Sequence, residues 1–420
     1  MVTTIERPIA ANPRTRTRKH IVPGALNTRA QQDVTTMRPD DAAIRVYSHS
    51  QLQTYQNCPR SYEWKYLEGL KTESTNAMNA GSVIHATLEA WYSEYTQPGT
   101  RSINTLFAAI RRKMQEQGVP LVIDPQTGVV LNYDTLTRED QVSYMQYMAT
   151  ARAYIDRYKS IDCAWEVIAT ECDIYAPIVN PNTGGRVHNA RILGRIDMVI
   201  RDRETDEYWI VEHKTKASID GDYLASLAMQ RQPQIYAMLA GYLLNVPISG
   251  VIYNVICRPG ISPKAGETDD EYQIRLAELT AASKTGKPST AKQRIAETPE
   301  SYLTRLAEWF ADPDKIRLHR EAIYYNETDL RNQQRELFEL VQMVGMNRSR
   351  GLWPKNTSQC YPFAGSNCPY VGLCAASNPL LLVDDWKERM AGGDSVGRGG
   401  HCFTVPTPSQ VMSDGWDSLL

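Results

Sequence analysis

The segment from Gly194 to Lys216, GRIDMVIRDRETDEYWIVEHKTK, has the pattern of two apolar strands joined by a polar turn, and it carries charges where buried strands rarely have them. Asp197 lies in the first strand, and Glu212 and Lys214 lie in the second. Because side chains alternate along a strand, Glu212 and Lys214 should share one face, about 7 Å apart. A turn near residues 203–206 places Asp197 roughly opposite Glu212. The segment therefore predicts a hairpin that gathers two carboxylates and an ammonium group.

Such a group of charges has two interpretations. Two converging carboxylates repel each other unless a cation lies between them, and oxygen ligands at about 2.0 to 2.1 Å suit magnesium. A lysine beside that ion can hold and help to deprotonate an attacking water. The alternative is an exposed ion pair at the end of a hairpin, which is common and contributes little to stability.

The rest of the chain predicts helices and strands between two loose ends. We expect residues 1–43 to be a flexible, mildly basic tail, residues 384–420 to be a second flexible tail, and residues 259–300 to be an exposed insertion. Between them we expect a helix begun by a capping box of Ser48 and Gln51, a helix over GSVIHATLEAWYSEYTQ, a long helix over 134–162, a strand reaching about residue 179, a helix over 223–244, strands at GVIYNVICRP and around HREAIYYN, and a helix closed by Gly345.

Composition and motifs exclude several classes of protein. The chain is 42% hydrophobic and 22% charged, as in ordinary globular proteins, and no run of about 18 apolar residues predicts a membrane span. The first residues do not have the pattern of a secretory signal, so we expect a cytoplasmic protein. The stretch TGKPST resembles the end of a phosphate-binding loop, but Ala281 and Pro288 break that motif. We therefore predict neither a nucleoside triphosphate site nor a motor.

Several motifs together resemble the PD-(D/E)XK nuclease superfamily, particularly its RecB-like exonuclease branch, which includes CRISPR-associated RecB-like and AddB-type nuclease domains. These motifs are GRID and VEHKTK in the hairpin, GSVIH ending at His85, ECDIY with Glu171, and QPQIY with Gln232 and Tyr236. They follow the family's order between residue 48 and about residue 378. The resemblance implies an α/β fold over residues 44–383. It would have a restriction-endonuclease-like mixed central sheet flanked by helices, with N-terminal helices and a C-terminal cysteine-rich segment.

The resemblance also assigns roles. Asp197 and Glu212, with the backbone carbonyl of His213, would bind catalytic Mg²⁺ or Mn²⁺, and Lys214 would position the attacking water. His85 would be a further metal ligand or would contact the scissile phosphate. Gln232 and Tyr236 would steady the site or contact DNA. Glu171 is the remaining acidic candidate, with a solvated carboxylate at a strand end as its alternative. Without the resemblance, a lone His85 would be expected to be a hydrogen-bonded packing residue.

Four of the eight cysteines form a further pattern. Cys360, Cys368 and Cys374 are separated by seven and five residues, whereas zinc modules commonly use pairs two to four residues apart. Cys58 supplies a fourth thiol. The resemblance implies that these four cysteines hold a 4Fe-4S cluster, which would act as a staple, since closing a loop of about 300 residues costs on the order of 5 kcal/mol. Zinc in the same site, or four unrelated cysteines, are the alternatives.

The expected function is therefore metal-dependent DNA hydrolysis, with an exonuclease acting on free ends as the favoured mode, in recombination, repair or phage DNA processing. A recombination or single-strand-annealing partner and an oligomeric state are compatible with this function. The net charge of −2 gives no separate indication of a polyanionic partner. One alternative is a non-catalytic DNA-binding or scaffold subunit of a nuclease or CRISPR-adaptation assembly. Another is an RNA-directed or transposition-type nuclease of the same fold.

Overall fold

The computed structural model describes most of the region between the two expected tails. The described residues are 34–36, 38–39, 43–70, 72, 76–93, 102–283, 288–362, 367–376, 379 and 383. Most of the expected tail over residues 1–43, and all of the tail over residues 384–420, lie outside them. In the part of the chain that the structure describes, no helix is both long and apolar enough to cross a membrane.

A mixed six-stranded sheet forms the centre of the molecule, in the order β1-β3-β4-β5-β6, with β2 also paired to β3. Pairing is parallel for β1 with β3 and for β4 with β5, and antiparallel for the others. The strands are β1 (Arg45–Ser48), β2 (Trp165–Val179), β3 (Arg186–Asp202), β4 (Tyr208–Lys216), β5 (Ile248–Cys257) and β6 (Leu318–Tyr324). The mixed central sheet with flanking helices is consistent with the restriction-endonuclease-like fold expected from the sequence.

The long strand β3 organises the sheet. Because β2 pairs with nearly its whole length, β1 and β4 must share its other edge. There β1 pairs with residues 190–193 and β4 with residues 198–201. Residues 194–197 lie between these two pairings and pair with neither strand. This unpaired stretch ends at Asp197.

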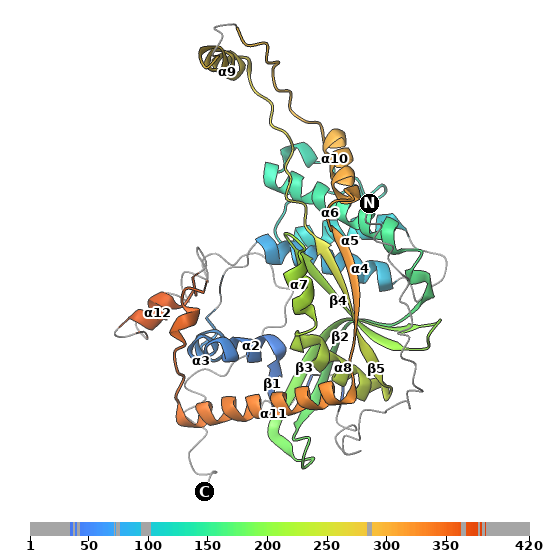
Figure 1. Cartoon of the computed structure of the whole chain (residues 1–420), viewed down its shortest axis with the longest axis vertical. Helices are drawn as coiled ribbons and strands as arrows, with labels where there is room; N and C mark the ends of the chain where they lie inside the picture. The colour runs from blue at the N-terminus through green and yellow to red at the C-terminus, as the bar shows by residue number, and fades with distance from the viewer. Residues whose placement is uncertain are drawn as a thin grey trace.

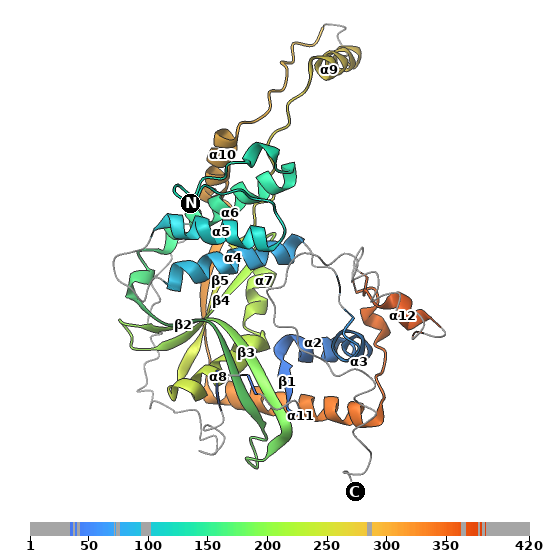
Figure 2. The same ribbon diagram turned by 180° about the vertical axis from the view of Figure 1, so that it is seen from behind.

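Helices cover both faces of the sheet (Figures 1 and 2). One hydrophobic core lies between the sheet and α4, α5 and α6, and the other between the sheet and α2, α8 and α11. The helices are α2 (His49–Asn57), α3 (Pro59–Tyr62), the π-helix η1 (Glu63–Leu67), α4 (Asn76–Ser93), α5 (Ile103–Glu116), η3 (Tyr133–Thr135), α6 (Arg138–Tyr158), η4 (Asp162–Ala164), α7 (Gly221–Leu227), α8 (Arg231–Leu244), α9 (Asp269–Ala281), α10 (Pro299–Ala311), α11 (Glu327–Arg350), η5 (Thr357–Gln359) and α12 (Val371–Ala375).

Most predicted elements are present, and two boundaries differ for identifiable reasons. The capping box of Ser48 and Gln51 is confirmed at the start of α2. The helix expected over 223–244 is two helices, and Pro233 lies in the first turn of the second, where its missing N–H has no partner to lose. The expected end at Gly345 is wrong: α11 continues to Arg350, and Gly351 caps it with φ 59°, a left-handed conformation that favours glycine.

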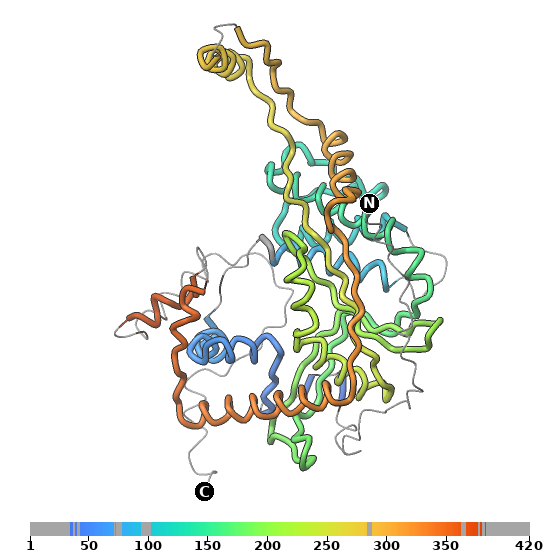
Figure 3. The backbone as a smooth tube through the Cα atoms, viewed as in Figure 1, coloured from blue at the N-terminus to red at the C-terminus, as the bar shows by residue number. Residues whose placement is uncertain are grey.

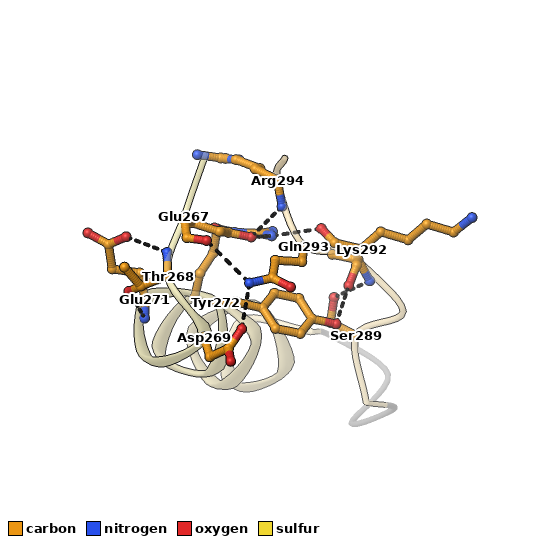
Figure 4. A network of polar contacts seen from close by, with 11 residues as sticks. Glu267, Thr268, Asp269, Glu271, Tyr272, Ser289, Lys292, Gln293 and Arg294 are labelled. Carbon is orange, nitrogen blue, oxygen red and sulfur yellow. Dashed lines mark hydrogen bonds and ion pairs between the residues drawn. The ribbon is translucent and has the colours of Figure 1, made fainter. Parts of the chain in front are cut away.

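The expected insertion forms a projecting arm between β5 and α10, with α9 near its tip (Figure 1). No residue of α9 is buried, so polar contacts rather than a core hold the tip together. Glu267 pairs with the Arg275 side chain. Figure 4 shows the surrounding network, in which Glu267 accepts the Arg294 N–H at 2.8 Å and the Gln293 amide donates to Asp269 at 2.9 Å. The sequence predicted exposure here but not this ordered helix.

Candidate active site

The strands β3 and β4 separate where their charged residues begin. Their ladder ends at the pair of Met198 and Val211, so Asp197 and Glu212 are the next residues of the two strands. The backbone N–H of His213 donates to Asp197 Oδ2 at 2.8 Å. This hydrogen bond fixes the Asp197 carboxylate beside the neighbouring strand.

Lys214 lies between Glu212 and helix α8. Its Nζ donates to Glu212 Oε1 at 2.6 Å and to Gln232 Oε1 at 3.1 Å. The Gln232 amide in turn donates to the Tyr236 hydroxyl at 2.7 Å. Gln232 and Tyr236 share a helix face because they are four residues apart. The two residues of the QPQIY motif therefore hold the lysine ammonium in place.

Gly194 explains why α8 can approach the sheet so closely. A Cβ atom at this position would lie 2.5 Å from Leu239 Cδ1 and 3.0 Å from Tyr236 Cδ1. Distances this short are not tolerated in packed interiors, so a larger residue would push α8 away. The glycine of the GRID motif thus positions the partners of Lys214, while Asp197 of the same motif supplies a carboxylate.

Helix α4 brings His85 to the carboxylates from the other side. Gly81, one turn earlier on the same face, lies against β4, where a Cβ atom would be 3.3 Å from Thr215 Oγ1. His85 Nδ1 lies 3.4 Å from Asp197 Oδ1 and 3.9 Å from Glu171 Oε1. The spacing of the GSVIH motif therefore combines a close helix contact with an imidazole directed at the acidic groups.

Glu171 has an unusual backbone conformation in the middle of β2. Its neighbours Thr170 and Cys172 pair with Met198 and Ile196, which places Glu171 opposite Asp197. Its φ is 43°, a left-handed conformation that costs a residue with a Cβ atom on the order of 1–3 kcal/mol. Strain of this kind persists where the surroundings enforce it, and here the strained residue brings a third carboxylate to the site. We call Asp197, Glu212, Lys214, His85 and Glu171 the carboxylate site.

The donor groups of the carboxylate site suit a hard divalent cation. His85, Glu171 and Asp197 can each offer one ligand atom, and these atoms lie within 4.8 Å of one another. Glu212 is 2% exposed, and its Oε2 has no hydrogen-bond partner in the described part of the chain. A buried, unsatisfied carboxylate oxygen is costly, on the order of 1–3 kcal/mol. Magnesium or manganese would satisfy it, so the residues present fit such an ion.

Neighbouring charges shift the protonation of these groups in different directions. Burial, followed by the charge of Asp197, raises the pKa of Glu212 to about 7, although Lys214 opposes the shift. For Asp197, burial is outweighed by His85 and the His213 N–H, so its pKa is lowered. For His85, burial is outweighed by Asp197 and Glu171, so its pKa is raised to about 10. The pKa of Lys214 is likewise raised, because Glu212 outweighs its burial.

A buried polar network lies behind the carboxylate site and was not predicted. The ring of His213 stacks on Tyr92 at a centroid distance of 6.1 Å, and its Nδ1 lies 3.3 Å from the Asn254 amide nitrogen. Arg320 donates to Asn254 Oδ1 at 2.6 Å and pairs with Asp162, which is 0% exposed. Burial lowers the pKa of His213 to about 3. Only Asn254, a polar residue within an otherwise apolar strand, gave a signal in the sequence.

The four cysteines expected to act together line one cavity of about 260 Å³. Cys58 lies between α2 and α3, Cys360 and Cys368 lie in the C-terminal segment, and Cys374 lies in α12. Figure 3 shows the blue N-terminal helices beside this red segment. We call these four residues the four-cysteine site.

Nearby N–H groups donate hydrogen bonds to two sulfur atoms of the four-cysteine site. The Asn356 N–H donates to Cys58 Sγ, and the Trp64 indole N–H donates to Cys374 Sγ, both at 3.4 Å. Burial raises the pKa of Cys368, and the thiols of Cys374, Cys360 and Cys58 add to this shift. All four cysteines thus line the same cavity and interact electrostatically there.

Comparison with known proteins agrees with this geometry. The model of the PD-(D/E)XK nuclease superfamily matches residues 46–375. The chain belongs to the PD-(D/E)XK nuclease superfamily. Membership indicates a nuclease, and nucleases of this superfamily use divalent metals. The match begins in β1 and ends in α12, so it includes every residue of the carboxylate site and the four-cysteine site.

The other comparisons add little to the superfamily match. The search of curated proteins gives no significant match. Among solved structures, the chain is similar to "Crystal structure of protein VC1899 from Vibrio cholerae", at 14% identity over 64% of this chain and 58% of that chain, with a TM-score of 0.15. The chain thus spans 58% of the length of that protein, and a TM-score this low supports no argument about fold or function.

Proposed function

We propose that this PD-(D/E)XK nuclease is a Mg²⁺- or Mn²⁺-dependent DNA exonuclease of the RecB-like branch. The observation that carries the proposal is the carboxylate site itself. Two carboxylates, a third from a strained residue and an imidazole converge there, with one buried carboxylate oxygen unsatisfied. A salt bridge on the surface would not need the burial of Glu212 or the strain at Glu171.

The residues of the carboxylate site would have different roles in hydrolysis. Asp197, Glu212, the backbone carbonyl of His213 and His85 would hold the metal ion, and Glu171 lies close enough to assist. When bound, the ion supplies a Lewis acid and a water of lowered pKa for attack in line at phosphorus. Lys214 then has a restricted role: its raised pKa keeps it protonated, so it donates hydrogen bonds to the attacking water or to a phosphate oxygen.

Helix α8 supports Lys214. Gln232 accepts one hydrogen bond from the ammonium and donates its own amide hydrogen to Tyr236. These two hydrogen bonds fix the direction of the Lys214 side chain, which is 29% exposed, without neutralising its charge. We infer that Gln232 and Tyr236 steady the lysine, and that Tyr236 contributes by orientation rather than by proton transfer.

We further infer that the four-cysteine site holds a 4Fe-4S cluster with a structural role. Four thiols around one cavity, with N–H groups donating to two of the sulfurs, are typical of such a site. Lys65 and Lys355 also line the cavity, and their positive charge would offset that of the thiolates. Zinc is the alternative occupant, and it would leave the purified protein colourless.

The proposed setting follows from the resemblance to the RecB-like branch. DNA with free ends is the substrate, the compartment is the cytoplasm of a prokaryotic or phage-infected cell, and the process is recombination, repair or phage DNA processing. The nuclease domain would comprise residues 44–383. A recombination or single-strand-annealing protein is the expected kind of partner.

The test is cleavage of end-labelled DNA by protein purified without oxygen. Linear and circular substrates are incubated with Mg²⁺ or Mn²⁺ and with the variants Asp197→Ala and Lys214→Ala. We expect degradation of linear DNA only, and losses of at least about 10³-fold in both variants, because each removes a group needed at the reacting phosphate. Lys159→Ala, which changes an exposed lysine at the end of α6, should cleave normally. Equal cleavage by wild type and Asp197→Ala would refute the assignment of the site.

A further inference from the structure

A cavity of about 470 Å³ adjoins the carboxylate site and has no assigned role. Gln232 and Tyr236, which hold Lys214, form part of its wall, so the cavity and the catalytic lysine share a boundary. Its volume falls within the roughly 300–1,000 Å³ of small-ligand pockets. The cavity is therefore large enough for one nucleotide and too small for a folded partner. We call it the flanking pocket.

The floor of the flanking pocket lies on the stretch of β2 and β3 that runs away from the carboxylate site. It is made of two opposed residue pairs of β2 and β3, Asp173 with Arg195 and Tyr175 with Leu193. Along β3, Arg195 and Leu193 precede Asp197 by two and four residues and share its face of the strand. The pocket therefore extends about 13 Å from the carboxylate. A strand of DNA held at the carboxylate site would have its next unit over this floor.

The pocket has an excess of positive charge. Its one lining carboxylate, Asp173, already accepts two hydrogen bonds from Arg195, at 2.8 and 3.0 Å. Arg38 also lines the pocket and is the second arginine there. Burial, followed by the charges of Lys214 and Arg231, lowers the pKa of His49 to about 4, so this lining imidazole is neutral. The two lining arginines therefore outnumber the one lining carboxylate, which favours an anionic ligand.

The start of α2 supplies a hydroxyl donor. Ser48 and Ser50 both line the pocket, and their hydroxyl oxygens lie 3.0 Å apart. Ser48 Oγ also accepts the backbone N–H of Gln51. Whichever serine donates to the other, one hydroxyl hydrogen remains that is not used among the described residues. That hydrogen can be donated to a phosphate oxygen.

Thr36 and Arg38 line the pocket beyond the strands. Thr35 exchanges two backbone hydrogen bonds with Tyr175, at 3.0 and 2.7 Å, and Thr36 and Arg38 line the pocket nearby. Tyr175 lies four residues along β2 from Glu171, so these residues lie at the end remote from the carboxylate site. Lining residues at this remote end would limit how far a strand can extend, which suits a terminal unit better than a continuous strand.

We propose that the flanking pocket binds the terminal phosphate-bearing nucleotide of a DNA strand, next to the bond that the carboxylate site cleaves. The proposal rests on the proposed function for its position relative to the cleaved bond. Arg38 and the serine pair would hold the phosphate, and Tyr175 would lie against the sugar or base. The pocket would thereby make the enzyme act at ends and release short products.

The first test measures binding without catalysis. Deoxythymidine 5′-monophosphate is titrated in the presence of EDTA into wild type, Asp197→Ala, Arg38→Ala, Ser50→Ala and the control Arg152→Ala, which changes an exposed arginine on α6. We expect equal affinity for wild type, Asp197→Ala and Arg152→Ala. Arg38→Ala should weaken binding about tenfold, because a hydrogen bond to a charged group is lost. Thymidine, which lacks the phosphate, should bind less tightly than the monophosphate.

The second test separates this proposal from the proposed function. With a short oligodeoxynucleotide, Arg38→Ala should raise KM and leave kcat nearly unchanged, whereas Asp197→Ala should abolish turnover. Cleavage by a wild type that binds no monophosphate, or monophosphate binding that Arg38→Ala and Ser50→Ala leave unchanged, would overturn the pocket alone. Monophosphate binding without any DNA cleavage would support the pocket as a nucleotide site and overturn the nuclease assignment.

Discussion

The carboxylate site and the four-cysteine site differ in what holds their residues in place. The residues of the carboxylate site come from three adjacent strands and one long helix, above two large cores. The four cysteines lie on short helices and loops from the two ends of the domain, around a small core of five buried residues, Trp64, Leu70, Tyr370, Leu373 and Val383. The fold therefore preorganises the carboxylate site, whereas the four-cysteine site has little packing of its own among the described residues and would gain most from the proposed cluster.

The buried network behind the carboxylate site gives the largest expected effect. Arg320→Ala should lower the free energy of unfolding by about 3–5 kcal/mol, because it leaves the fully buried Asp162 without its ionic partner. Denaturant unfolding measures the loss. The matched control is Arg152→Ala, which breaks the exposed pair of Arg152 and Asp156 and should cost less than about 1 kcal/mol. Similar losses in both variants would mean that the network does not stiffen this region.

The stability of the region around the four-cysteine site should depend on the proposed cluster rather than on buried packing. Cys368→Ser should lower stability by about 2–4 kcal/mol, comparable to the loss of a crosslink that closes a long loop, and should remove the brown colour that the proposed cluster would give. Thermal unfolding and the visible spectrum report the two effects together. Cys163→Ser changes an exposed cysteine outside the site and should alter neither. Cys368→Ser protein with unchanged colour and melting would show that the fold alone joins the two ends.

The same contrast explains how much could be predicted from the sequence. Strand alternation and helix spacing placed Asp197 near Glu212, and Gln232 near Tyr236, because these relations depend on local geometry. The network of Asp162, Asn254 and Arg320 depends on packing between elements far apart in the chain, and no local pattern encodes it. The flanking pocket was also missed, because it joins elements far apart in the chain and because Arg38 lies in a segment expected to be a flexible tail.

The carboxylate site should also bind its metal in competition with protons. The pKa of Glu212 is raised to about 7 by burial and Asp197, and that of His85 to about 10, where acidic neighbours outweigh burial. Metal ions bind the deprotonated forms, so binding must release these protons. Mg²⁺ affinity should therefore increase with pH, by up to about tenfold per pH unit for each proton released.

Calorimetry between about pH 6 and about pH 8, in buffers of different ionisation enthalpy, measures both the affinity and the protons released. Asp197→Ala should remove the metal-binding signal, and Cys368→Ser should leave its pH dependence unchanged, because the four-cysteine site contributes no titrating ligand to the ion. An affinity that stays flat across this range would mean that Glu212 and His85 do not bind the metal. In that case the raised pKa values of Glu212 and His85 would reflect only burial and neighbouring charges. The carboxylate site would then not be preorganised for a cation.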